Sequence, residues 1–390
     1  MESKEFKRKH KEDRPVIAIC YDFDKTLSPY DMQEQGFIQS VGCIPQDFWT
    51  ESNGLAANND MDQNLAYMLK MTKESEGNVI LNKKALYDYG AQIKLFPGVE
   101  TWFDRIKKYG QKRGVIIEHY IISSGLKEMI EGTSIAQSGA FEKIYASSFY
   151  YNDRGVAIWP AQVVNFTNKT QYLFRIEKGV LDINDPAVND HFEPADLRVP
   201  FRNMIYIGDS DTDIPCMKLV SLFGGHSIGV FNAGTKDKTK VFKMMKDNRI
   251  KYFASTDYSE GSELEQIVKA IINKTADNEI LENMHYGYQK ECMDFYNKNN
   301  NAALERKERI NALEDSCNFS STHMAIKGLS KYIDSFSEEE INELISIALN
   351  NSQVLYILRD YDVKNFYTAI ISRLSKQNND SEYVRELINR

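Results

Sequence analysis

The residues best suited to chemistry in this sequence are two aspartates, Asp22 and Asp24, which stand one residue apart. They directly follow a run of mostly apolar, β-branched residues, Val16 to Tyr21, which is typical of a strand buried on both faces of a parallel sheet. The carboxylates would then lie at the carboxyl end of this strand, where open α/β sheets bind their ligands. Two neighbouring carboxylates raise each other's pKa unless a cation lies between them. We therefore expect a hard divalent cation with oxygen ligands, Mg²⁺, at this strand end.

A simpler interpretation of the same stretch is a strand followed by an ordinary turn, because Asp and Ser are common turn residues. Three stretches further along the chain favour the chemical interpretation. Each places polar side chains at the end of a predicted strand or the start of a predicted helix. They contain Ser123, Lys169 and the pair Asp209 and Asp213, in that order.

The elements that must position these residues follow from the spacing of the apolar residues along the chain. Single strands are predicted at residues 16–21, 115–122, 203–207, 227–231 and 250–254, and a strand pair at 141–158. Helices are predicted at residues 99–109 and 168–178. Residues 31–94 show helical spacing broken by polar turns, and residues 262–390 show helical spacing throughout.

The order of these motifs resembles that of the haloacid dehalogenase superfamily of phosphohydrolases, and more narrowly its phosphoserine-phosphatase-like branch. The resemblance rests on Asp22-x-Asp24-x-Thr26, on Ser123 after an apolar strand, on Lys169 at a helix start, and on Gly208-Asp209-x-x-x-Asp213. It covers about residues 15 to 260. This branch has a small helical cap between the first two motifs, which matches the insertion at residues 31–94.

The resemblance and the predicted elements together imply an α/β protein with three parts. The first is a three-layer, Rossmann-like phosphatase core with a parallel sheet, formed by residues 15–30 and 95–261. The second is an inserted helical cap at residues 31–94, and the third is an all-helical C-terminal domain at residues 262–390. The C-terminal domain lies outside the resemblance, so its role has to be argued separately.

The resemblance assigns a role to each acidic residue of the motifs. Asp22 would be the nucleophile that forms an aspartyl-phosphate, and Asp24 the general acid that later activates water as a base. The carboxylates of Asp22 and Asp209 and the backbone carbonyl of Asp24 would bind Mg²⁺. Asp213 would act from outside the metal shell, by holding Lys169 or a metal-bound water.

The remaining motif residues would bind the phosphate. Ser123 would donate its hydroxyl, with Ser124 as the rival donor, and Gly125 would offer a backbone N–H at a helix start. Lys169 would bring a positive charge to the phosphate and the nucleophile. The ordinary alternatives are a helix N-cap for Ser123 and an exposed lysine for Lys169. Ser124 stands where many relatives have glycine, so the amino-acid substrate of the name-giving branch is not carried over.

Composition and charge limit the binding partners and the cellular compartment that can be expected for this protein. The chain has 390 residues and a formal net charge of −8, which does not suggest nucleic acid as the main partner. The charged N-terminus has no apolar core of signal-peptide type, and no apolar run could span a bilayer. The five cysteines show neither zinc-ligand nor redox spacing. We therefore expect a cytoplasmic protein with free thiols.

The sequence as a whole predicts a Mg²⁺-dependent phosphatase that hydrolyses a small soluble phosphomonoester through an aspartyl-phosphate. Two alternatives remain. One is an interaction protein whose C-terminal helices bind a protein partner or a second copy, with the core as effector. The other is a phosphotransferase that uses the same residues with an acceptor other than water. Glu34, soon after the first motif, is a candidate for substrate contact from the cap.

Overall fold

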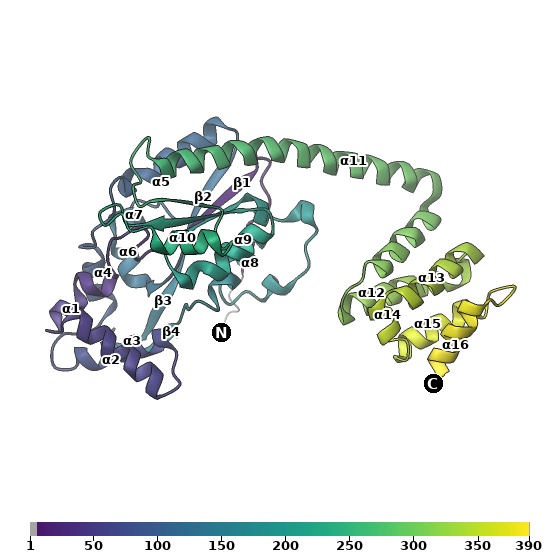
Figure 1. Cartoon of the computed structure of the whole chain (residues 1–390), viewed down its shortest axis with the longest axis horizontal. Helices are drawn as coiled ribbons and strands as arrows, with labels where there is room; N and C mark the ends of the chain where they lie inside the picture. Colours follow the sequence, from purple (N-terminus) through teal and green to yellow (C-terminus); the bar gives the residue numbers. More distant parts are fainter. Residues whose placement is uncertain (1–5, 390) are drawn as a thin grey trace. The chain divides into compact units, whose positions relative to one another are not determined.

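The computed structural model describes residues 6–389, and the side chains of all of these except residues 296–302. Within this part of the chain, seven strands form one sheet in the order β4-β3-β2-β1-β5-β6-β7 (Figure 1). Neighbouring strands are parallel, except that β4 is antiparallel to β3. The strands are β1 (Val16–Tyr21), β2 (Ile116–Leu126), β3 (Lys143–Tyr151), β4 (Ala157–Gln162), β5 (Met204–Gly208), β6 (His226–Phe231) and β7 (Tyr252–Ser255).

Helices cover both faces of this sheet. They are α5 (Val99–Lys112), α6 (Lys127–Gly132), α7 (Ser134–Gln137), α8 (Lys169–Lys178), α9 (Ile214–Leu222), α10 (Thr239–Lys246) and the start of α11 (Glu263–Glu314). Ile17 and Ile19 of β1 share an apolar cluster with residues of α5 and α11. Ala18 and Cys20 share another with residues of α8, α9 and α10. Because successive side chains of a strand point to opposite faces, both faces of β1 are buried, which explains its apolar sequence.

The insertion after β1 is helical, as predicted. It contains η1 (Met32–Gln35), α1 (Phe37–Ser40), α2 (Pro45–Asn58), α3 (Gln63–Ser75) and α4 (Lys83–Gly90). Its apolar side chains, among them Phe48, Met68 and Leu86, belong to the same cluster as one face of the sheet. The predicted three-layer α/β core with an inserted cap is therefore confirmed.

The C-terminal part of the chain is all-helical, also as predicted. After α11 it contains α12 (Phe319–Leu329), η6 (Ser330–Ser335), α13 (Glu338–Asn350), α14 (Ser352–Tyr356), α15 (Tyr361–Ile371) and α16 (Asn379–Asn389). Helix α11 has 52 residues, but no helix in the described part of the chain is both long and apolar enough to cross a membrane.

The chain divides into two compact units, one ending at Asn283 and the other running from Met284 to the C-terminus. The apolar clusters of the first unit reach only as far as Ala276, and that of the second spans residues 310–388. The boundary expected near residue 262 falls at the start of α11. The first turns of this helix bury Leu264 and Val268 in the core of the first unit.

We expect a shortened protein that ends at Asn283 to fold on its own. It keeps the buried face of α11 and the ion pair between Glu279 and Arg202, whose Oε1 and Nε atoms lie 3.0 Å apart. The predicted result is a cooperative thermal transition in circular dichroism. A matched protein that ends at Ser262 loses Leu264 and Val268, each worth about 2–5 kcal/mol of unfolding free energy when its buried side chain is removed.

One result with the two shortened proteins would contradict this expectation. If the protein ending at Asn283 binds a hydrophobic dye and melts without cooperativity, the first unit depends on residues beyond Asn283, and the division into two folding units is wrong. The protein ending at Ser262 supplies the reference for such a loosened state, because it exposes the face of the sheet that α11 covers.

Candidate active site

Three neighbouring strands bring the first and last motifs together. Tyr21, the last residue of β1, is level with Ile121 of β2 and Ile207 of β5. The backbone N–H of the next residue, Asp22, donates to the carbonyl of Ile207 at 3.0 Å. The chain leaves β1 towards β2 on one side and, after β4, returns to β5 on the other side of β1, and such a switch in strand order opens a crevice at the carboxyl ends of the strands.

A cavity of about 270 Å³ lies at this crevice. Six of the residues predicted from the sequence line it: Asp22, Asp24, Ser123, Ser124, Gly125 and Asp209. The two other predicted residues, Lys169 and Asp213, are fully buried and lie behind Asp22 rather than on the cavity wall. The structure thus brings the four motifs to one place. Six of their residues line the cavity, and Lys169 and Asp213 form a buried layer behind them.

Lys169 forms the centre of the buried layer. Its Nζ lies 2.7 Å from Asp213 Oδ1 and 3.2 Å from Asp22 Oδ1. Burial alone would lower the pKa of this ammonium group, but the Asp213 and Asp22 carboxylates raise it well above its ordinary value. Lys169 therefore remains charged and fixes one oxygen of Asp22 from the interior of the protein.

The carboxylate of Asp213 is fully engaged by the protein. Oδ1 accepts from Lys169 Nζ and from Tyr206 Oη at 2.9 Å. Oδ2 accepts from Ser210 N at 3.2 Å and from Ser210 Oγ at 2.9 Å. Four hydrogen bonds leave little capacity for a metal, which supports the predicted role in holding Lys169. Residue 208 must be glycine for this arrangement, because a Cβ atom on Gly208 would lie 2.6 Å from Asp213 Oδ2.

Asp24 is held from the cap side of the cavity. Its Oδ1 accepts from the backbone N–H of Met32, in η1, at 2.9 Å. Gly125 lets this pair approach β2, because a Cβ atom there would lie 2.2 Å from Met32 Cε and 3.0 Å from Asp24 Oδ2. The glycine therefore makes room for the acid and its partner, in addition to any contact with a ligand.

One expectation about the Ser123 motif is wrong. The turn expected at residues 123–125 is extended strand instead, because β2 continues to Leu126, while the helix that follows begins at Lys127 as α6. Pairing with β3 on both sides of a bulge keeps the chain extended between Ser123 and Leu126. The Gly125 N–H donates to Ser123 Oγ at 3.1 Å, so this hydroxyl already accepts one bond and keeps its own proton for a ligand.

The acidic groups of the cavity repel one another strongly. Burial, with the nearby Asp213 carboxylate, raises the pKa of Asp22 to about 6 against the opposing effect of Lys169. Burial, Asp213 and Asp22 raise the pKa of Asp209 to about 7. Burial and neighbouring carboxylates also raise the pKa of Asp24 well above its ordinary value. Such a site favours a proton or a cation over free carboxylates.

The donor atoms fit a hard divalent cation. One oxygen from each of Asp22, Asp209 and Asp213 lies within 4.8 Å of the others. Since Lys169, Tyr206 and Ser210 occupy Asp213, the oxygens left for a cation are those of Asp22 and Asp209. Carboxylate oxygens are the ligands that Mg²⁺ prefers, so the residues present suit the cation expected from the sequence.

Mg²⁺ should therefore stabilise the protein in a pH-dependent way. Folded Asp209 has a pKa near 7 and unfolded Asp one near 3.8, so the metal-free folded state retains protons that the unfolded state has released. The contribution of Asp209 to the stability of the metal-free protein then falls as the pH rises from about 4 to 7 and levels off above. We expect saturating Mg²⁺ to raise the melting temperature by about 5 °C at pH 8 and by clearly less at pH 5.

Scanning calorimetry with two matched variants checks this expectation. Asp209→Asn should remove the Mg²⁺ shift and raise the melting temperature of the metal-free protein at pH 8, because a repelling charge is lost. Asp211→Asn changes an exposed acid of the same loop and should keep the full shift. An equal Mg²⁺ shift at both pH values would show that the cation does not bind through these carboxylates.

Other residues that line the cavity were not singled out in the sequence. They are Lys25, Asp31, Asp62, Gln63, Asn64, Asn165, Phe166, Ser210, Thr212 and Lys240. Some carried a local signal. Asp62 stands where the helical spacing of α3 begins, a typical N-cap, and Asn165 precedes the first turn of α8. Their meeting across the cavity depends on the tertiary structure.

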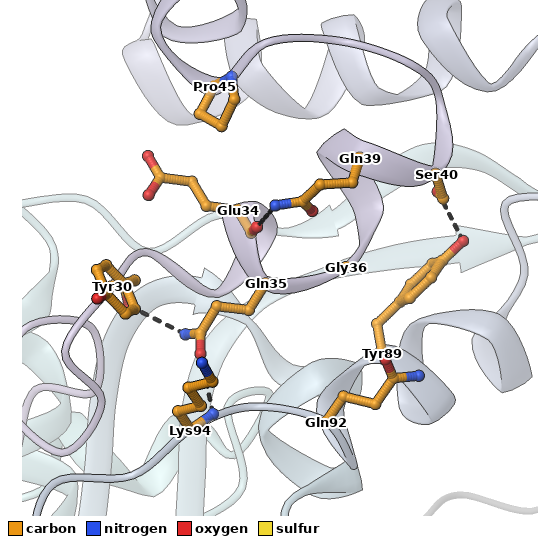
Figure 2. Close-up of a pocket in the computed structure, with 10 residues that line it drawn as sticks. All are labelled: Tyr30, Glu34, Gln35, Gly36, Gln39, Ser40, Pro45, Tyr89, Gln92 and Lys94. Atoms are coloured by element: carbon orange, nitrogen blue, oxygen red, sulfur yellow. Dashed lines mark hydrogen bonds between the residues drawn. The ribbon is translucent and has the colours of Figure 1, made fainter.

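Glu34 does not line this cavity. It lies in a larger one of about 860 Å³ within the cap, where residues of η1 and α1 face residues of α4 and the segment after it (Figure 2). Its Oε1 accepts from Trp49 Nε1 at 2.8 Å. Glu34 therefore lies outside the wall of the acidic cavity, and its candidate contact with a substrate stays a prediction.

Comparison with known proteins identifies the family. The sequence pattern of the family described as haloacid dehalogenase-like hydrolase matches residues 19–218, which is 200 of the 390 residues. The matched part contains all four motifs, from Asp22 to Asp213. The chain therefore belongs to the haloacid dehalogenase-like hydrolases.

Individual relatives are more distant. An uncharacterised protein of Borreliella burgdorferi is 28% identical in an alignment of length 276 that covers 64% of this chain and 94% of that protein. A solved HAD-family hydrolase from Salmonella enterica serovar Typhi is 19% identical, with a TM-score of 0.42, covering 62% of this chain and 69% of that one. A probable phosphoserine phosphatase from Vibrio cholerae is 12% identical, with a TM-score of 0.44, covering 68% and 67%.

Proposed function

We propose that this protein is a Mg²⁺-dependent phosphatase that hydrolyses a small phosphomonoester through an aspartyl-phosphate. One observation carries the proposal: Asp22 lines the cavity while Lys169, 3.2 Å from its Oδ1, holds it from behind. A carboxylate so oriented keeps its second oxygen free for attack on phosphorus. The volume of about 270 Å³ suits a phosphate with a small alcohol group better than a large ester.

The two aspartates divide the chemistry. Asp22 Oδ2 attacks phosphorus, and the bond from phosphorus to the leaving oxygen breaks. Asp24, whose pKa burial and neighbouring carboxylates raise well above its ordinary value, is suited to give a proton to that oxygen. Asp24 then takes a proton from the water that attacks the aspartyl-phosphate, which releases phosphate and restores Asp22.

Other groups stabilise the charge that moves in these steps. Ser123 donates its hydroxyl to a phosphoryl oxygen, and Lys169 balances the charge that remains on Asp22. Asp213 keeps Lys169 in place. Mg²⁺, bound by Asp22, Asp209 and the backbone carbonyl of Asp24, would neutralise negative charge on the phosphoryl oxygens.

A panel of phosphomonoesters tests the proposal. The purified protein is mixed with an aryl phosphate and with small sugar, polyol, amino-acid and carboxylic-acid phosphates, in Mg²⁺ or in excess chelator. We expect phosphate release in Mg²⁺ and none with chelator. Turnover that persists in chelator, or no turnover on any ester, contradicts the proposal. Alcohol release that exceeds phosphate release when glycerol is added would instead indicate transfer to an acceptor other than water.

A further inference from the structure

The N-terminal turns of α3 make one of the contacts between the cap and the catalytic core, beside the packing of α4 on α6. Asp62 Oδ2 accepts from Asn165 Nδ2 at 2.8 Å, and Asn64 Nδ2 donates to the carbonyl of Val164 at 2.8 Å. Tyr67 Oη donates to the carbonyl of Ser124 at 2.8 Å. These three bonds join the cap to two segments that carry motif residues.

Asn165 uses all of its polar groups except the side-chain amino group, which bonds Asp62, to shape the start of α8. Its side-chain Oδ1 accepts from Thr167 N, from Thr167 Oγ1 and from Asn168 N, at 2.6 to 3.0 Å. Its backbone carbonyl accepts from Lys169 N at 3.0 Å, and its own N–H donates to Asn168 Oδ1 at 2.9 Å. Asn165 therefore sets the turn from which Lys169 enters the protein interior.

Asp62 stands at the start of a cap helix, α3, as Asn165 stands before the start of the core helix α8. Its Oδ1 accepts from Asn64 N at 2.8 Å and Leu65 N at 3.1 Å, which caps α3. Its Oδ2 is the atom that meets Asn165. The bond between Asp62 and Asn165 thus links the N-terminal ends of two helices, one in the cap and one in the core. Both side chains also line the cavity, so a ligand there lies beside the link.

We infer that Asn165 is a positioning residue through which docking of the cap fixes Lys169 behind the nucleophile, an inference that rests on the proposed phosphatase function. When Asp62 is bound to Asn165, the turn before α8 is held on both sides and Lys169 Nζ stays within reach of Asp22 and Asp213. When the cap moves away, that turn loses its outer support. Turnover then depends on the cap contact even though Asn165 touches neither reacting oxygen nor phosphorus.

Exchanging the residue types of Asp62 and Asn165, singly and together, tests this inference. Asn165→Asp keeps an acceptor for the turn of α8 but puts two carboxylates face to face. We expect it to lower kcat by about 10- to 100-fold, with KM changed less than about threefold, as for other groups that orient a catalytic residue. Asp62→Asn leaves two amide groups facing each other and should also lower kcat. The double variant restores one donor and one acceptor, keeps the cap of α3, the acceptor for the turn before α8 and the net charge, and should recover kcat to within about threefold of the natural protein.

The inference is overturned if Asn165→Asp has the kcat of the natural protein. It is also overturned if the double variant does not recover the lost kcat. Melting temperatures show whether a variant has lost its fold. If Asn165→Asp does not fold, the kcat of Asp62→Asn is compared with that of the double variant instead. If the natural protein hydrolyses no phosphomonoester, the proposed function fails. The link is then decided by hydrogen exchange at residues 166–171, which should rise in Asn165→Asp and return in the double variant. Unchanged exchange would overturn it.

Discussion

Replacing Asp22 with Asn is expected to abolish turnover while leaving the fold intact. The amide has the same shape but cannot attack phosphorus, so kcat should fall by about 10⁴-fold or more. The fold should persist because burial and Asp213 already raise the pKa of Asp22 to about 6, so its charge is a cost at neutral pH. Steady-state kinetics and the circular dichroism spectrum measure the two effects.

Two further variants show whether the loss of turnover in Asp22→Asn is due to loss of the nucleophile. Asp211→Asn changes an exposed acid near the same site and should turn over like the natural protein. Asp24→Asn should slow the release of phosphate from Asp22, so that labelled aspartyl-phosphate accumulates and can be trapped in acid. Turnover by Asp22→Asn at the natural rate, with an unchanged spectrum, would mean that another group is the nucleophile.

Replacing Lys169 with Met should damage both activity and stability. The variant leaves Asp22 and Asp213 facing each other in a buried site without a positive charge between them. Removing one partner of a buried charged group costs about 3–5 kcal/mol of unfolding free energy. We also expect kcat to fall by about 10³-fold or more, because the charge left on the nucleophile after attack is no longer balanced.

Urea unfolding at two pH values checks the cause. The loss of stability in Lys169→Met should be smaller at pH 5 than at pH 8, because Asp22 can then take up a proton and end the repulsion. A surface pair supplies the control: Lys84→Met breaks the contact between Lys84 and Asp88 on α4, where both side chains are exposed. That change should cost less than about 1 kcal/mol. Equal losses in the two variants would show that the buried charge of Lys169 has no special importance.

The order and place of the motifs could be predicted from the sequence because each one sits at the end of a strongly patterned element. The apolar run before Asp22 could only be a strand covered on both faces, and parallel strands place their carboxyl ends at one edge of the sheet. Asp22 and Asp209 meet for that reason. Asp213 is close to Gly208 in the chain, so a short local turn brings it to the same strand end, whereas its bond to Lys169 spans 44 positions.

The conformation of residues 123–125 was mispredicted because the deciding interaction is not local. Ser and Gly after a strand favour a turn, yet pairing of β2 with β3 on both sides of a bulge keeps these residues extended. A Cβ atom on Gly125 would lie 2.2 Å from Met32 Cε, so the glycine also lets Met32 pack against this stretch. Tertiary contacts here override local preference, as they commonly do for short segments.

The sequence alone therefore determined the family, the parallel strands and the acidic residues that gather at the end of β1, because these depend on apolar periodicity and on motifs a few residues long. The tertiary structure decided what surrounds them. It put Glu34 in a different cavity, set Lys169 behind Asp22, and joined Asp62 to Asn165, which is 103 positions away in the chain. Contacts between such distant residues depend on how the cap packs on the core, and no periodicity in either segment specifies that packing.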